Sequence, residues 1–75
     1  MICPEASEEQ RLKAMHTVIA AMPHLDETFS YDEFLVMSAL TLGFLIKGDI
    51  PKRSDWNAMI EFIDDVRTAE TAVKN

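Results

Sequence analysis

The stretch that decides the fold is residues 30–48, which read SYDEFLVMSALTLGFLIKG. Ser30 and Glu33 have the spacing of a capping box, in which each side chain accepts a hydrogen bond from the other residue's backbone amide. Gly48 is suited to the left-handed backbone conformation that ends a helix. The pattern therefore predicts a helix over about residues 31–47, roughly 25 Å long at 1.5 Å per residue.

Two further helices are expected, one before and one after this segment. Ser7 and Gln10 form a second capping-box pattern, which predicts a helix over about residues 8–22. Pro23 should end that helix, because proline donates no backbone N–H and disfavours helical geometry in the preceding residue. A third helix is expected over about residues 55–73, with Asp55 at its first position.

Both flanking helices are expected to be amphipathic, because their apolar residues recur at helical spacing. The stripe of the first helix consists of Leu12, Met15, Val18, Ile19 and Met22. The stripe of the third helix consists of Met59, Phe62, Val66, Ala69 and Val73, widened by Trp56, Ile60 and Ile63. The sequence therefore predicts an all-α fold: a single small three-helix domain over residues 1–75, with residues 1–6 frayed.

The central helix poses a burial problem, because it is apolar on nearly every side. Two amphipathic helices can cover only part of it, and each Leu or Phe left in water forfeits roughly 1.5–3 kcal/mol. We therefore expect a dimeric helical bundle built on this helix. The residues expected at the self-association surface are Val36, Ala39, Leu40, Gly43 and Phe44. The small Ala39 and Gly43 would admit a second copy of the helix; alternatively they admit a neighbouring helix of the same chain.

Composition and motifs argue against catalysis and against a bound cofactor or metal. The chain has one cysteine, which excludes a disulfide scaffold. Its two histidines, His16 and His24, have no serine or cysteine nucleophile at a spacing typical of catalysis. A calcium-binding loop starting at Asp26 fails, because Tyr31 and Met37 occupy its glycine and bidentate glutamate positions. We expect no enzyme activity, no cofactor and no metal site.

Membranes and nucleic acids are also unfavourable partners. The longest apolar segment runs from residue 34 to 46, well short of the roughly 20 residues that span a bilayer. No basic stretch precedes an apolar run at the N-terminus, and a lone thiol suits a reducing compartment, so we expect a cytoplasmic protein. The net charge is −6, from 13 acidic and 7 basic residues, and the third helix is acidic. Such a helix would repel phosphate, which argues against direct binding of nucleic acid.

What remains is protein binding. Glu61, Asp64 and Asp65 lie together on the polar face of the third helix, which suits a protein partner with a basic surface. We predict a small acidic regulator, adaptor or inhibitor that acts by protein–protein contact. Two alternatives remain open: a phage- or plasmid-encoded anti-defence inhibitor that imitates nucleic acid, and a structural subunit of a larger assembly. No motif in the chain identifies a family.

Overall fold

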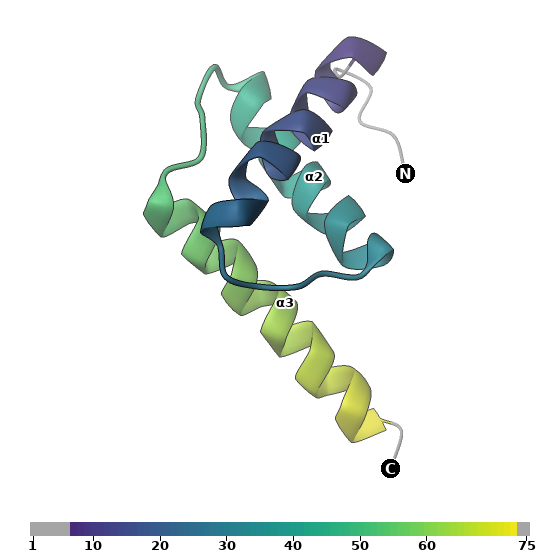
Figure 1. The fold of residues 1–75 in the computed structure, drawn as a ribbon. Coiled ribbons are helices and arrows are strands. Elements are labelled where there is room, and N and C mark those ends of the chain that lie inside the picture. The colour runs from purple at the N-terminus through teal and green to yellow at the C-terminus, as the bar shows by residue number, and fades with distance from the viewer. Residues whose placement is uncertain (1–6, 74–75) are drawn as a thin grey trace.

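All regular structure in the computed structural model, which describes residues 7–73, is helical (Figure 1). The α-helices are α1 (Glu8–Ala21), α2 (Tyr31–Ile46) and α3 (Arg53–Val73), and a short 3-10 helix, η1, covers Met22–His24. No strand occurs within these described residues. The all-α prediction with three helices is therefore confirmed. The predicted frayed segment, residues 1–6, lies outside the described residues.

Both predicted capping boxes are present. In α1, the Gln10 amide donates to Ser7 Oγ (3.1 Å) and the Ser7 amide donates to Gln10 Oε1 (3.0 Å). In α2, the Glu33 amide donates to Ser30 Oγ (3.2 Å) and the Ser30 amide donates to Glu33 Oε1 (2.9 Å). Each box satisfies two amides that a helix N-terminus would otherwise leave without a partner. The starts of both helices therefore follow from contacts between residues three positions apart.

The end of α2 is a Schellman motif. Gly48 has a φ of +83°, as the sequence predicted, and its amide donates to the Leu45 carbonyl (3.0 Å). The Asp49 amide donates to the Phe44 carbonyl (2.9 Å). This pair of bonds satisfies two of the last carbonyls of the helix. The regular helix ends at Ile46, and Lys47 is the C-cap.

The end of α1 and the start of α3 each differ slightly from the expected positions. The regular helix α1 ends at Ala21, and the chain tightens into η1 because Pro23 cannot donate to the helix. α3 begins at Arg53, two residues earlier than expected. The reason is that the Asp55 carboxylate accepts a hydrogen bond from the Lys52 amide (2.8 Å), which places Asp55 at the third helical position instead of the first.

The core lies where the three helices meet. α1 crosses α2, and α3 runs below them in this view, with its last turns extending past the other two helices (Figure 1). The buried hydrophobic cluster consists of Val18, Leu25, Met37, Trp56, Met59 and Ile63. The backbones of α1 and α2 approach closely, whereas α3 approaches α2 at few positions. The small residues Ala14 and Ser38 are both buried, which is consistent with this close packing of α1 on α2.

The expected stripe of α1 is wrong in part. Leu12 and Ile19 are 48% and 52% exposed, whereas Ala14 and Val18 are buried. The helix is rotated so that its small Ala14 lies inward, and a small side chain allows helix axes to come closer than a leucine would. The apolar residues of α1 thus occupy more of its circumference than the core can cover.

The stripe of α3 is also rotated from the expected one. Trp56 and Ile63 are buried as part of the core, but Phe62 and Val66 are 49% and 40% exposed. Four residues after Ile63, the same side of the helix carries Arg67, which is half-buried.

None of the helices in the described part of the chain is both long and apolar enough to span a bilayer.

Candidate protein-binding surface

One side of α2 is apolar and yet exposed. We call this side the outer face; its members are Leu35, Val36, Ala39, Leu40, Gly43 and Ile46, with Asp32 and Lys47 at its two ends. Val36 and Leu40 are 38% and 37% exposed, and Leu35 and Ile46 are similarly exposed. The opposite side of the helix, which includes Met37 and Thr41, is buried. Val36 and Leu40, two of the apolar residues expected to remain exposed in a single chain, are therefore partly exposed.

The two small residues of the outer face do not contact another helix of the same chain. Ala39 is exposed. A Cβ atom added to Gly43 would meet no atom within 4 Å, so the space beside this glycine is open. Among the described residues, therefore, Ala39 and Gly43 do not serve to admit α1 or α3. That alternative reading of the sequence is wrong, and the space beside them is available to another molecule.

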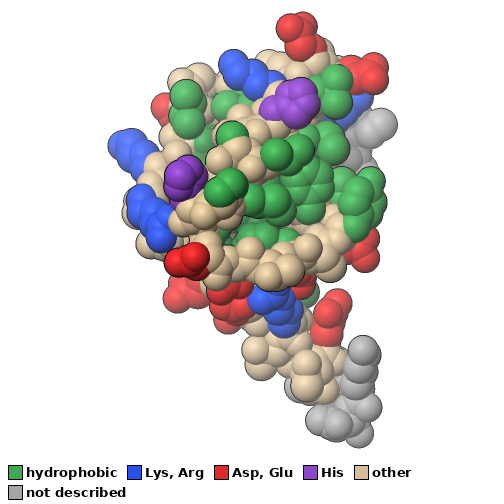
Figure 2. Space-filling model, in the orientation of Figure 1, with side chains coloured by type: hydrophobic (Ala, Val, Ile, Leu, Met, Phe, Trp, Pro, Cys, Tyr) green, Lys and Arg blue, Asp and Glu red, His purple; other side chains and the backbone are tan. Residues whose placement is uncertain are grey.

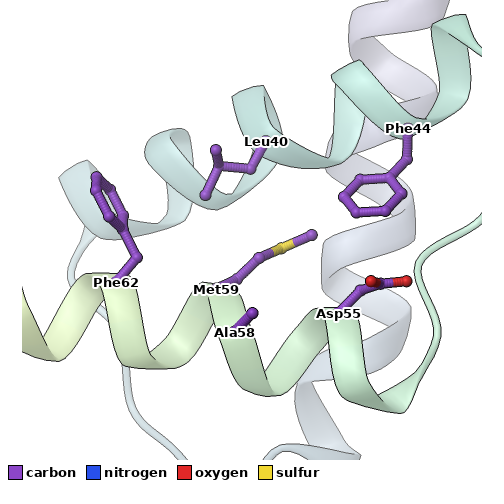
Figure 3. A pocket seen from close by; sticks show the side chains of 6 residues that line it. All are labelled: Leu40, Phe44, Asp55, Ala58, Met59 and Phe62. Carbon is purple, nitrogen blue, oxygen red and sulfur yellow. The ribbon is translucent and has the colours of Figure 1, made fainter.

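An open groove continues from the outer face towards α3. Leu40 and Phe44 reach from α2 over Met59 and Phe62 of α3 (Figure 3). This part of the groove has a volume of about 270 Å³, and Asp55 stands at its end below Phe44. Its lining is otherwise apolar. Phe44, which the sequence placed at the self-association surface, thus lies in the groove and is half-buried.

The groove continues towards the start of α2. There it passes between Val36 on one side and Phe62 and Val66 on the other, in a second hollow of about 350 Å³. The carboxyl groups of Asp32 and Glu70 border this hollow. Phe62 lines both parts of the groove. The surface between α2 and α3 is therefore apolar along its middle and carries carboxylates at both ends.

A cluster of charged residues around Arg67 holds α3 against the start of α2. Arg67 Nε and Nη2 donate to the two carboxylate oxygens of Glu33, each at 2.8 Å. This is a bidentate pair, the strongest common geometry for two charged side chains. The pKa of Glu33 is lowered from 4.5 to about 2, mainly by the hydrogen bonds from Arg67 and next by the hydrogen bond from the Ser30 amide. Glu33 thus has two roles, because it also completes the capping box of α2.

The same guanidinium also ties down the segment that joins η1 to α2. Arg67 Nη2 donates to the Thr28 carbonyl (2.9 Å), and Nη1 lies 3.6 Å from Glu27. The guanidinium carbon lies 5.8 Å from the centre of the Phe29 ring. No sequence motif singles out Arg67, although its spacing of four from Ile63 places it at the end of the buried stripe. Of its ion partners, Asp64 is three residues away, but Glu33 and Glu27 lie 34 or more residues away in the chain.

The structure places the predicted acidic residues of α3 in two different environments. Glu61, Asp64 and Asp65 are all exposed. Asp64 accepts a hydrogen bond from Arg67 Nη1 at 3.0 Å. In the described part of the chain, Glu61 and Asp65 form no ion pair. Of these three residues, Glu61 and Asp65 therefore offer uncompensated charge. Both lie on the side of α3 turned away from Ile63.

A second apolar area lies on another side of the molecule. Figure 2 shows hydrophobic side chains gathered where α1 lies over α2, with charged side chains around them. The exposed surface of α1 includes Leu12 and Ile19, but Lys13 and His16 lie beside Leu12 and interrupt it. It is therefore less uniformly apolar than the outer face of α2.

Nothing in the described residues points to metal binding, since no group of three or more His, Cys, Asp or Glu side chains is placed to hold an ion. Both histidines are exposed. The carbonyl of His24 accepts a hydrogen bond from Arg53 Nη1 (2.7 Å).

Comparison with protein-family models, with curated proteins and with solved structures finds no match for this chain.

Proposed function

We propose that this protein acts without catalysis, by protein–protein contact, and that one of its contacts is with a second copy of itself through the outer face of α2. The observation that carries this proposal is the row of exposed aliphatic side chains on that face, including Val36 and Leu40. Contiguous exposed apolar patches on small proteins typically mark interaction sites. Burying them in a dimer would recover part of the hydrophobic free energy that the single chain forgoes.

We further propose that the polar side of α3 contacts a different protein, one with a basic surface. Glu61 and Asp65 supply uncompensated negative charge, and Phe62 stands beside them 49% exposed. Charge of this kind speeds association, while a single exposed aromatic residue suits a pocket on the partner. In this role the protein would be a regulator, adaptor or inhibitor of a larger protein, and the single cysteine favours the cytoplasm as its location.

Imitation of nucleic acid and a structural role in a larger assembly stay as alternative predictions. No observation favours either of them. Arg67 pairs with Glu27, Glu33 and Asp64, which lowers the negative charge along one side of the molecule. A nucleic-acid mimic needs a regular array of uncompensated charge, so this arrangement gives the first alternative no support.

Self-association is tested by sedimentation equilibrium at micromolar concentration. The mass should be near twice the 8.5 kDa of the chain. Val36→Ser should shift the protein towards the single-chain mass, because it places a hydroxyl in the apolar contact. Ile19→Ser is the matched control, since it makes the same kind of change on exposed α1 and should leave the mass unchanged. A stronger effect of Ile19→Ser would move the contact to α1, and a single-chain mass for the unchanged protein would refute self-association.

The contact with a different protein is tested by photo-cross-linking in the native host. A photoreactive phenylalanine analogue in place of Phe62 should give adducts heavier than a cross-linked pair of chains. The same analogue in place of Ala20, an exposed residue of α1, is the control and should not give these adducts. Glu61→Lys with Asp65→Lys should abolish the adducts while the protein stays folded by circular dichroism. Equal adducts from both positions, or none at all, would refute the proposal for α3.

A further inference from the structure

We propose that the two copies pair through antiparallel α2 helices, related by a twofold axis that passes between Ala39 and Leu40. This inference rests on the self-association proposed above, and it adds the orientation and register of the two helices. Its basis is the distribution of charge and side-chain size along the outer face. Both properties are complementary when the face meets a reversed copy of itself, whereas a parallel copy places like charges together and leaves the space beside Gly43 opposite another glycine.

The charges at the two ends of the outer face have opposite signs. Asp32 lies in the first turn of α2 and Lys47 lies at its C-cap, so they are about 22 Å apart along the axis. Both side chains are exposed, and neither forms an ion pair within the described residues. A twofold axis between Ala39 and Leu40 brings each Asp32 next to the partner's Lys47. Parallel helices would instead place like charges side by side, which is destabilising.

The sizes of the residues between these ends fit the same axis. It places Val36 opposite the partner's Gly43 and Leu40 opposite the partner's Ala39. Val36 and Leu40 therefore each face a small residue, and the open space beside Gly43 is filled by a valine. Large and small residues in alternation allow two helices to pack closely without voids. Among the described residues, no atom of the same chain fills the space beside Gly43.

Helix electrostatics favour the same orientation. The N-terminus of a helix carries partial positive charge and the C-terminus partial negative charge, so reversed neighbours place opposite ends together. The arrangement also leaves the proposed partner site accessible. Asp65 follows Ile63 by two residues and therefore points away from α2. A dimer formed this way would present two copies of the acidic side of α3.

Cysteine cross-linking distinguishes the two orientations. Two variants would be prepared, Asp32→Cys and Lys47→Cys, each also carrying Cys3→Ser, with a tag on one of them so that the products differ in mass. After mixing and mild oxidation, antiparallel pairing should give the mixed covalent dimer in several-fold excess over both symmetric dimers. In that mixed dimer the second charge pair remains intact. Thr68→Cys, at an exposed position of α3, is the control and should cross-link no faster than by random collision.

Charge reversal provides a second, independent readout. Asp32→Lys or Lys47→Asp alone should weaken dimerisation by about tenfold, because two attractive exposed pairs become repulsive. The double variant restores both pairs and should regain the original dimerisation, although each change opposes the helix dipole within the chain. A double variant weaker than either single one would therefore overturn the proposal.

The possible outcomes separate this inference from the broader one. A single-chain mass in sedimentation refutes self-association itself. A double-chain mass combined with predominantly symmetric cross-links from both cysteine variants refutes only the antiparallel arrangement. A double-chain mass with no cross-link above the Thr68→Cys control places the contact on another surface, and so overturns the register as well.

Discussion

The two sides of α2 are nearly equal in hydrophobicity, but they have opposite environments. The inner side buries Met37 together with two polar residues, Ser38 and Thr41. The hydroxyl of Thr41 donates a long hydrogen bond to the sulfur of Met59 (3.9 Å). Ser38 Oγ has no hydrogen-bond partner among the described residues. The outer side leaves more than a third of the Val36 and Leu40 surface exposed. Polarity therefore does not decide which side of α2 is buried.

The sharpest test of this comparison is a pair of truncations on opposite sides of the helix. Met37 is fully buried, so Met37→Ala should lower the free energy of unfolding by about 2–5 kcal/mol. Val36→Ala should change it by less than about 0.5 kcal/mol when the protein is dilute enough to be monomeric. Urea denaturation at several protein concentrations measures both values. Equal losses in dilute solution would show that Val36 is also part of the core of the single chain.

The two glycines of the chain provide a pair of substitutions with opposite signs. Gly48→Ala should lower the free energy of unfolding by about 1–2 kcal/mol, because its φ of +83° strains a residue with a Cβ. Gly43→Ala should raise it by about 0.5–1 kcal/mol in the single chain, because alanine is the better helix former and the space is open. Chemical denaturation of dilute protein gives both values. A loss at Gly43 in dilute protein would mean that something in the chain packs there.

The ion pair between Glu33 and Arg67 should make stability depend on pH. The pKa of Glu33 is lowered to about 2 in the folded protein, so its contribution is fully present above about pH 4.5 and is lost as the pH falls towards 2. Glu33→Gln should therefore flatten the fall in melting temperature over this range, measured by circular dichroism. Glu61→Gln is the control and should leave the slope as in the unchanged protein. Parallel curves for Glu33→Gln and the unchanged protein would contradict the ion-pair geometry.

The smallest effects are expected on the acidic side of α3. Glu61→Gln with Asp65→Asn should change the free energy of unfolding by less than about 0.5 kcal/mol, since both residues are exposed. Asp64→Asn should cost somewhat more, because it removes the pair with Arg67. The double variant should associate more slowly with a partner captured through Phe62. Its association rate should also depend less on salt concentration. Unchanged rates would show that these charges serve only to keep the protein in solution.

The starts of α1 and α2 and the end of α2 were predictable because their hydrogen bonds join residues three to five positions apart. Ser7 with Gln10 and Ser30 with Glu33 form the boxes that their spacing indicates. The rotation of α1 and α3 was not predictable in the same way. Both helices carry more apolar residues than one face can bury, and the buried line depends on the shape of the neighbouring helices. The contact of Arg67 with Glu33 has no local signal, because 34 residues separate them.

The sequence by itself determined three helices, where α1 and α2 begin, the left-handed turn after α2, and an excess of apolar surface on the central helix. These features depend on local hydrogen bonds and on composition, which do not require knowledge of the neighbours. Only the tertiary structure decided which side of α2 remains exposed, that Phe62 and Val66 border a groove, and that Asp64 is paired while Glu61 and Asp65 are not. Those outcomes depend on how the three helices pack against one another, and that packing involves residues far apart in the sequence.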